Sequence, residues 1–304
     1  MGPAPIRRVA IIGFGEAGGI IGSDLAAQGV EVSVFDILLL ANETRDAMLA
    51  KARESKVQAK ESLADCLRDA ELVISAVTAS SSLEVARDAA NGMRLGQTFM
   101  DINSVSPRAK RVEAGHIERS GAHYVESAVM AAVPPQRLKV PMLLGGSYAA
   151  ELAPRLALLG MNATVVSDKI GVASAVKMCR SVMIKGMEAL AVECLFAARC
   201  YGAEEAVLAS LDATYPQMGW REELPDYLVS RVAEHGRRRA AEMREVAESL
   251  RDVGVRPVMA EATAESQDWL ADAMVEENLK YKSTTPFSWI ALAERLCAAS
   301  AKRK

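Results

Sequence analysis

Hydrophobic and polar positions follow two different patterns along the chain, and the change lies near residue 167. Before it, short apolar runs rich in β-branched residues recur between segments of helical period. The runs predict strands at 9–12, 32–35, 72–77, 98–102, 123–129, 141–146 and 163–166. Helices are predicted at 17–28, 81–90, 107–120 and 148–158, the third opening with a proline directly after a serine. This rhythm predicts βαβ units and a mostly parallel, doubly wound sheet.

The strand pattern stops after residue 167. From residue 171 onward the chain is rich in Ala, Leu, Met, Glu and Arg, which favour helices. Breaks near Gly202, Pro216, Pro225, Gly254–Pro257 and Pro286 divide this part into five to seven predicted helices. We therefore expect an α/β Rossmann domain over residues 1–167 and an all-helical domain for substrate binding and dimerisation over residues 168–304.

Composition narrows the class of protein. With 304 residues, 50% of them hydrophobic and 25% charged, the chain has enough apolar content for a folded core, so general disorder is excluded. A net charge of -3 gives no electrostatic reason to expect nucleic acid or an anionic membrane as partner. No apolar stretch approaches the roughly 20 residues that span a bilayer. The first apolar run leads straight into a glycine motif and is interpreted as a strand, not a signal peptide.

The cysteines and histidines give no metal motif. Five cysteines include no CxxC pair and three histidines include no HExxH, so no metal is expected. An odd cysteine count without a secretory leader suggests a reducing, cytoplasmic compartment. Cys179, Cys194 and Cys200 lie in apolar helical stretches, so we expect them to be core residues and not nucleophiles.

A glycine motif follows the first predicted strand. Its three glycines permit a tight turn, close approach of the backbone to a pyrophosphate, and close packing of helix on strand. Eighteen residues after the last glycine, Asp36 ends the second predicted strand, where a carboxylate accepts hydrogen bonds from ribose hydroxyls and disfavours a 2′-phosphate. The alternative to dinucleotide binding is a glycine-rich turn that binds no ligand. The context favours NAD over NADP as cofactor, bound by Gly13, Phe14, Gly15, Glu16, Ala17, Gly18 and Asp36.

A second group of small polar residues ends the predicted strand at 72–77. Ligands of such sheets bind at the carboxyl ends of the strands, so Val77 and Thr78 are expected to line the cofactor. The same segment also fits a serine-capped helix start at Ser81, and both interpretations are compatible.

The predicted helix at 171–190 carries polar residues on one face of a largely apolar sequence. Ser174, Lys177 and Ser181 follow at helical spacings, with Lys185 a turn further on. A lysine on an apolar helix must reach solvent, pair or lose its charge, and a lysine that titrates near neutral pH serves as a proton donor and acceptor. The alternative is a solvated stripe or a structural ion pair.

With these motifs in order, the chain resembles the β-hydroxyacid dehydrogenase family, which includes 3-hydroxyisobutyrate and 6-phosphogluconate dehydrogenases. The resemblance extends over the whole chain and is closest to a phosphogluconate-dehydrogenase-like subgroup with a distinct helical C-terminal domain. It rests on IIGFGEAG, DINSVSP (101–107), VESAVMAAVPP (125–135), LLGG (143–146) and GVASAVKMCRS. The implied activity is NAD(P)-dependent hydride transfer at the carbinol carbon of a hydroxy acid or sugar acid.

The resemblance implies roles for individual residues. Lys177 is the expected general acid and base, Ser104 is expected beside the nicotinamide and the substrate, and Asn103 is expected at the cofactor. Ser181 stands where the family has an asparagine that assists the lysine, and Ser181 or Asn103 is expected to orient that lysine.

The expected substrate-binding residues depart from the family pattern. The loop that is usually DAPVSGG reads ESAVMAA here, without the serine and glycines that bind a carboxylate. His235 and Arg238 resemble a His and Arg pair on a later helix of the subgroup, although a charge-rich run is also typical of a solvated helix face. The expected substrate residues are Ser104, Met130, Ala131, Ala132, Lys177, His235 and Arg238, and backbone N–H groups near Met130 to Val133 are expected to bind a substrate carboxylate.

Other functions remain open from the sequence. The same fold and lysine suit an imine reductase or an oxidative decarboxylase. A non-catalytic dinucleotide-binding regulatory protein is also compatible with the altered loop. A homodimer through the helical domain is expected.

Overall fold

A computed structural model describes residues 3–281 and 286–302. The chain forms two compact units, Met1–Lys177 and Met178–Lys304, which we call the N-terminal and C-terminal units and describe separately. The predicted domain division between residues 167 and 168 stays a prediction.

The N-terminal unit is built on one eight-stranded sheet with the order β3-β2-β1-β4-β5-β6-β7-β8. All seven predicted strands are present, and β3 is an additional two-residue strand. Neighbouring strands are parallel except β6 and β7, which pair antiparallel. The strands are β1 (Arg8–Ile12), β2 (Glu31–Phe35), β3 (Gln58–Ala59), β4 (Leu72–Ser75), β5 (Thr98–Asp101), β6 (His123–Val129), β7 (Met142–Gly145) and β8 (Ala163–Ser167).

Helices connect the strands. The four predicted helices are α1 (Glu16–Ala27), α4 (Ser82–Gly92), α5 (Pro107–Glu118) and α7 (Ala149–Leu158). At the start of α5 the Ser106 hydroxyl accepts a hydrogen bond from the Ala109 N–H, as a capping serine does. The sequence did not predict α2 (Asn42–Glu54), α3 (Leu63–Leu67) or α6 (Val133–Gln136). In α2 only Met48 and Ala52 are buried, so its sequence carries almost no apolar periodicity.

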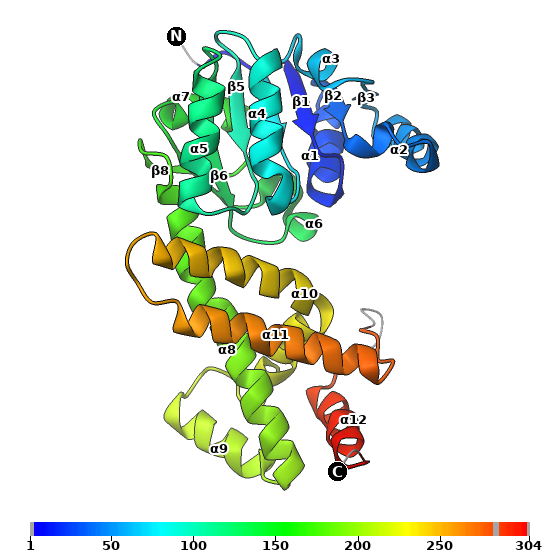
Figure 1. Cartoon of the computed structure of the whole chain (residues 1–304), viewed down its shortest axis with the longest axis vertical. Helices are drawn as coiled ribbons and strands as arrows, with labels where there is room; N and C mark the ends of the chain where they lie inside the picture. The colour runs from blue at the N-terminus through cyan, green and yellow to red at the C-terminus, as the bar shows by residue number, and fades with distance from the viewer. Residues whose placement is uncertain (1–2, 282–285, 303–304) are drawn as a thin grey trace. The chain divides into compact units, whose positions relative to one another are not determined.

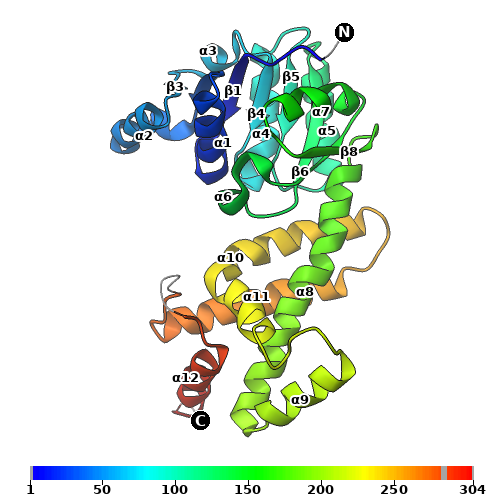
Figure 2. The same ribbon diagram turned by 180° about the vertical axis from the view of Figure 1, so that it is seen from behind.

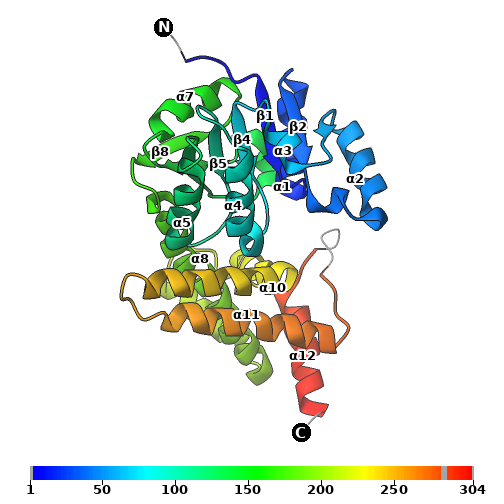
Figure 3. The ribbon, with the colours of Figure 1, turned by 45° about the horizontal axis from the view of Figure 1, so that its top comes forward.

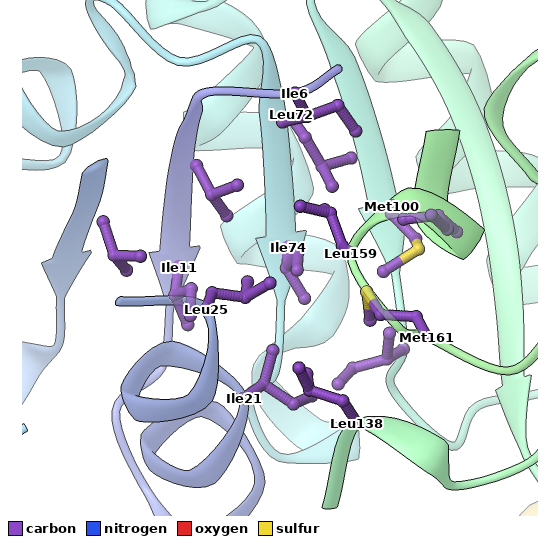
Figure 4. Close-up of a cluster of buried hydrophobic side chains, with 14 of the residues drawn as sticks. Ile6, Ile11, Ile21, Leu25, Leu72, Ile74, Met100, Leu138, Leu159 and Met161 are labelled. Carbon is purple, nitrogen blue, oxygen red and sulfur yellow. The ribbon is translucent and has the colours of Figure 1, made fainter. Parts of the chain in front are cut away.

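The two faces of the sheet are covered by different helices. Helices α4 and α5 lie over one face (Figure 1), and α1 and α7 lie over the other (Figure 2). Successive strand residues point to opposite faces, so Val9 and Ile11 join the α1 side whereas Ala10 and Ile12 join the α4 side. Figure 4 shows the larger of these two cores, where Ile11 meets Ile21 and Leu25 of α1.

The strand order reverses between β1 and β4. Strands β2 and β3 extend the sheet on one side of β1, and β4 continues it on the other. The carboxyl ends of β1 and β4 therefore lie at the point where the strand order reverses, the usual ligand position in such sheets.

The C-terminal unit is helical. Its helices are α8 (Val172–Tyr201), which begins in the N-terminal unit, α9 (Glu204–Thr214), α10 (Leu224–Arg251), α11 (Val258–Glu276) and α12 (Trp289–Lys302). Helices α10 and α11 lie side by side (Figure 3), and they approach so closely that a side chain at Gly236 would press on the Gln267 carbonyl. The expected break near Pro225 is present, because α10 begins at Leu224 and Pro225 lies in its first turn, where no N–H is needed.

The expectation that Cys179, Cys194 and Cys200 are core residues is wrong. Cys179 and Cys194 are exposed, whereas the neighbouring Met178, Leu195 and Phe196 are buried. Cys200 forms a disulfide with Cys297 of α12. Apolar neighbours in the sequence did not reveal which side of the helix each cysteine occupies.

Within residues 3–281 and 286–302, no helix combines the length and the apolar character required to cross a membrane.

Candidate active site

The glycine loop between β1 and α1 is shaped by its backbone. Gly13 has φ of +90°, and a side chain there would overlap the Ala76 carbonyl in the loop after β4. A side chain at Gly18 would overlap the Gly13 carbonyl. At Gly15, in contrast, a Cβ would meet no atom within 4 Å. Two of the glycines are therefore required by packing, and the middle one leaves open room in front of the loop.

The start of α1 is suited to an anion. Its N-cap, Gly15, provides no side-chain hydrogen bond to the first-turn N–H groups. These groups, at Glu16, Ala17 and Gly18, carry the positive end of the helix dipole. The open room at Gly15 and the uncapped helix start fit the pyrophosphate of a dinucleotide.

Asp36 closes the loop from the end of β2. Its Oδ2 accepts a hydrogen bond from the Phe14 N–H at 2.6 Å, and its Oδ1 accepts from the Leu38 N–H at 3.0 Å. The carboxylate therefore lies beside the glycine loop, and its expected contact with the ribose hydroxyls stays a prediction.

Lys51 is a residue of this loop that the sequence analysis missed. It extends from α2, and its Nζ donates to the carbonyl oxygens of Phe14 at 2.6 Å and Gly15 at 2.8 Å. The ammonium also lies 4.6 Å from the centre of the Phe14 ring. By binding the carbonyls, Lys51 helps to fix the peptide planes whose N–H groups form the loop. A lysine in a polar helix has no sequence signal for such a contact.

Asn103 links the β4 and β5 loops. Its Oδ1 accepts from the Val77 N–H at 2.7 Å, and its Nδ2 donates to the hydroxyls of Ser75 at 2.9 Å and Ser82 at 3.1 Å. With these partners Asn103 holds Val77 in place, and its expected part in orienting Lys177 stays a prediction. Thr78 is exposed at the same edge of the sheet.

Lys177 and Ser104 meet in the N-terminal unit. The Lys177 Nζ donates to the Ser104 Oγ at 2.5 Å, and both side chains are half-buried. Ser104 lies in the loop between β5 and α5, and Lys177 lies in the second turn of α8. The two residues that the family resemblance assigned to the chemistry are thus brought together by the fold. Ser181 follows Lys177 by one helical turn on α8, in the C-terminal unit.

The expected substrate loop follows β6. Its Met130 N–H donates to the Pro141 carbonyl at 2.9 Å, an interaction made by the antiparallel β6–β7 pair. This N–H is therefore not free for a substrate carboxylate, which corrects the expectation for Met130. Ala131 and Ala132 are exposed just before α6.

His235 and Arg238 lie on α10 in the C-terminal unit. The Arg238 guanidinium donates to Glu242 at 2.8 Å, and the same glutamate pairs with Lys185 of α8 at 2.5 Å. Burial, with the nearby positive charge of Arg238, lowers the pKa of His235, so the imidazole is neutral near pH 7. Glu234 lies 3.3 Å from this ring.

A buried charged network lies beneath the Ser104 loop, and the sequence did not reveal it. Asp101 Oδ2 lies 2.7 Å from the Lys110 Nζ and accepts from the Tyr124 hydroxyl at 2.8 Å, and that hydroxyl lies 3.1 Å from Glu113 Oε2. Burial and the neighbouring Asp101 raise the pKa of Glu113 to about 8. In the sequence, Lys110 and Glu113 are three residues apart in a helix, a spacing that is typical of a solvated face.

Comparisons with known proteins extend over nearly the whole chain. Residues 8–166 match the NAD binding domain of 6-phosphogluconate dehydrogenase, and residues 198–270 match a domain of unknown function, DUF1932. A conserved hypothetical protein from Sinorhizobium meliloti 1021 is 36% identical and superposes with a TM-score of 0.81, covering 97% of this chain and 97% of that one.

Two further structures are similar. A conserved protein of unknown function with structural similarity to 3-hydroxyacid dehydrogenases is 34% identical, with a TM-score of 0.72 over 88% of this chain and 98% of that one. A Mycobacterium tuberculosis 3-hydroxyisobutyrate dehydrogenase with L-serine, at 14% identity, has a TM-score of 0.74 over 96% of this chain and 99% of that one. At this identity the likeness shows the fold alone. The predicted fold class, a Rossmann domain followed by a helical region, is confirmed.

Proposed function

Because the chain belongs to the family built on the NAD binding domain of 6-phosphogluconate dehydrogenase, we propose that it is an NAD(P)-dependent oxidoreductase acting on the carbinol carbon of a hydroxy acid or sugar acid. The observation that carries the proposal is the contact between Lys177 and Ser104 in the same unit as an open glycine loop. A proton-transfer group and a hydroxyl that can hold a substrate are then available at one place.

The dinucleotide would supply hydride chemistry at its nicotinamide. The chain's own residues bind and orient it: the first-turn N–H groups of α1 take the pyrophosphate, and Asp36 takes the ribose hydroxyls. A carboxylate at this position repels a 2′-phosphate, so we propose NAD in preference to NADP. Val77, Thr78 and the segment held by Asn103 line the cofactor.

Lys177 acts on the substrate proton. In the oxidation direction the neutral amine takes the hydroxyl proton from the substrate while Ser104 holds that hydroxyl, and in the reverse direction the ammonium returns the proton. Ser181, one turn further along α8, assists Lys177.

We propose substrate-binding residues in the loop after β6 and on α10. In the N-terminal unit, the N–H groups of Ala131 and Ala132 take a substrate carboxylate, and Met130 contributes an apolar side. In the C-terminal unit, His235 and Arg238 stay proposed substrate-binding residues. We also propose that the protein forms a homodimer through its helical unit, which light scattering of the purified protein tests.

The test of the proposed activity is a spectrophotometric screen at about 340 nm, the absorbance of the reduced nicotinamide. The full-length protein is offered NAD or NADP with a panel of hydroxy acids and sugar acids, and NADH or NADPH with a panel of imines. Turnover of a hydroxy acid or sugar acid supports the proposal, and turnover of an imine alone reassigns the substrate class. Tight binding of NADH without turnover of any compound overturns the catalytic proposal in favour of a dinucleotide-binding regulatory protein.

A further inference from the structure

Glu126 is a buried acid that the proposed chemistry does not use. It lies on β6 with no exposed surface and is the first residue of the expected substrate loop ESAVMAA. We infer that Glu126 is a positioning residue that fixes the start of α8 and thereby the placement and charge state of Lys177. This inference rests on the proposed function of Lys177.

The Glu126 carboxylate is bound by the beginning of the lysine helix. Oε1 accepts from the backbone N–H groups of Gly171 at 2.6 Å and Ala173 at 3.0 Å. Oε2 accepts from the Ser174 N–H at 3.2 Å and from the Ser174 hydroxyl at 2.8 Å. A side chain from a distant strand therefore caps α8.

The surrounding backbone is built to admit this carboxylate. A side chain at Gly145 of the neighbouring strand β7 would overlap Glu126 Oε1. Gly171 has φ of +102°, and a side chain there would approach both Arg111 and Pro107 at the start of α5. The two glycines belong to LLGG and GVASAVK, motifs that carried the family resemblance but have no part in the proposed chemistry. The lack of a side chain at Gly145 is explained by the room that Glu126 needs, and at Gly171 by its positive φ and the closeness of Arg111 and Pro107.

Moving the start of α8 away from Glu126 would cost free energy. A buried carboxyl group that loses its donors is left without hydrogen-bond partners, so its four hydrogen bonds hold the first turn of α8 in place. Lys177 lies in the next turn of the same helix and reaches Ser104 from there. Pro107, which packs against Gly171, begins the helix directly after the Ser104 loop. Through α8 and Pro107, Glu126 therefore helps to fix the positions of both Lys177 and Ser104.

The charge of Glu126 also acts on Lys177. The start of α8 carries the positive end of its dipole, which disfavours an ammonium nearby, and the carboxylate offsets it. Lys177 is five residues past Val172, about 8 Å along the helix axis. Other charged groups beside this helix start are Arg111 of α5 in space, and Asp168, Lys169 and Arg180 in the chain, and the variants below leave them in place.

The test measures the protonation of Lys177 without relying on a substrate. The full-length protein is labelled with ¹³C at the lysine Cε atoms, and the Lys177 signal is assigned by its absence in Lys177→Met. In Glu126→Gln we expect the midpoint of the Lys177 titration to fall by about half to one pH unit, because a negative charge is lost near the ammonium. Turnover is expected to fall about 10- to 100-fold, with the KM for the cofactor unchanged.

Two variants complete the design. Glu126→Asp keeps the charge but is too short to reach all four donors, so we expect a wild-type midpoint with reduced turnover. Glu113→Gln, at another fully buried glutamate of the same unit, controls for the loss of a buried carboxyl. It is expected to leave the midpoint of the Lys177 titration unchanged and the turnover within about twofold of wild type.

Each result decides the inference. An unchanged Lys177 midpoint in Glu126→Gln overturns it, and so does equal loss of turnover in Glu126→Gln and Glu113→Gln. If Glu126→Gln does not fold, wild-type turnover in Glu126→Asp overturns it instead. A shifted midpoint in a protein that turns over no substrate retains the positioning of Lys177 by Glu126 and contradicts the proposed activity alone.

Discussion

The Nζ atom of Lys177 donates to the hydroxyl of Ser104 at 2.5 Å, although 73 positions separate the two residues in the chain. One comes from a helix and the other from a loop at the carboxyl edge of the sheet, so their contact depends on the assembled N-terminal unit.

Replacement of this lysine tests its role in proton transfer. Lys177→Met should reduce turnover about 10³-fold or more, because no other group is proposed to take the substrate proton, while NADH binding stays within about twofold. Lys169→Met, at an exposed lysine eight residues earlier, is the control. Turnover and fluorescence titration with NADH check the prediction, which fails if Lys177→Met remains active.

Cofactor choice is tested at Asp36. Asp36→Ser should weaken NADH binding about 10-fold and increase the affinity for NADPH relative to NADH, because the carboxylate that repels a 2′-phosphate is removed. Titration of both cofactors measures the ratio, with Asp46→Ser on the exposed side of α2 as control. A ratio equal to that of wild type would show that Asp36 does not set the preference.

Two substitutions in the glycine loop are expected to affect different properties, one the stability and the other the binding of NADH. Gly18→Ala should lower the melting temperature because the added methyl overlaps the Gly13 carbonyl. Gly15→Ala should leave the melting temperature nearly unchanged, since its methyl meets open space, but should weaken NADH binding at least about 10-fold. Gly115→Ala on α5, where a Cβ also meets no atom within 4 Å, is the control for both measurements. Undiminished NADH binding by Gly15→Ala would mean that no pyrophosphate approaches the loop.

The buried network predicts a pH dependence of stability. The pKa of Glu113 is raised to about 8 in the folded protein from an ordinary value of 4.5, so the protonated form is favoured by folding. Its contribution is fully present below about pH 4.5 and is lost as the pH rises through 8. Burial alone would raise the pKa of Asp101, but the charge of Lys110 holds it below its ordinary value of 3.8. The contribution of Asp101 to the free energy of unfolding is therefore lost only at a pH below that value.

Glu113→Gln should remove that dependence. Between pH 5 and 9 the free energy of unfolding of the wild type should fall by about 2–4 kcal/mol more than that of the variant. Urea unfolding at several pH values measures the difference, and Glu118→Gln on the exposed side of α5 is the control. Parallel curves for wild type and Glu113→Gln would contradict the assignment.

The disulfide predicts a stability that depends on reductant. Cys200 and Cys297 are 97 positions apart and join α8 to α12, so their bond restricts a long stretch of the unfolded chain. Replacing both by serine should lower the free energy of unfolding by about 2–4 kcal/mol and make it insensitive to dithiothreitol. Cys194→Ser, at an exposed free cysteine, should keep the wild-type response. Chemical unfolding with and without reductant checks this, and identical wild-type curves would contradict it.

Several features could be predicted from the sequence because they depend on near neighbours. Strand and helix patterns repeat within a few residues, so seven strands and four helices of the N-terminal unit were found close to their bounds. The glycine motif and Asp36 were also recognisable, because the turn, the helix start and the strand end that place them are local. The polar helix α2, with two buried residues, was missed for the same reason: its local pattern resembles a solvated segment.

The remaining features were decided by the tertiary structure. Glu126 looked like a departure from a substrate loop, Lys110 and Glu113 looked solvated, and Cys200 looked like a core residue. Each of these residues has partners that only the folded chain brings to it. Glu126 binds the start of α8, and Cys200 bonds to Cys297. Lys110 and Glu113 contact Asp101 and Tyr124, and they lose their solvent only when α5 packs on the sheet. The sequence by itself determined the elements and the cofactor motif, whereas long-range pairing decided which charges are buried and which helix start is fixed, because the energy of a buried polar group depends on what surrounds it in space.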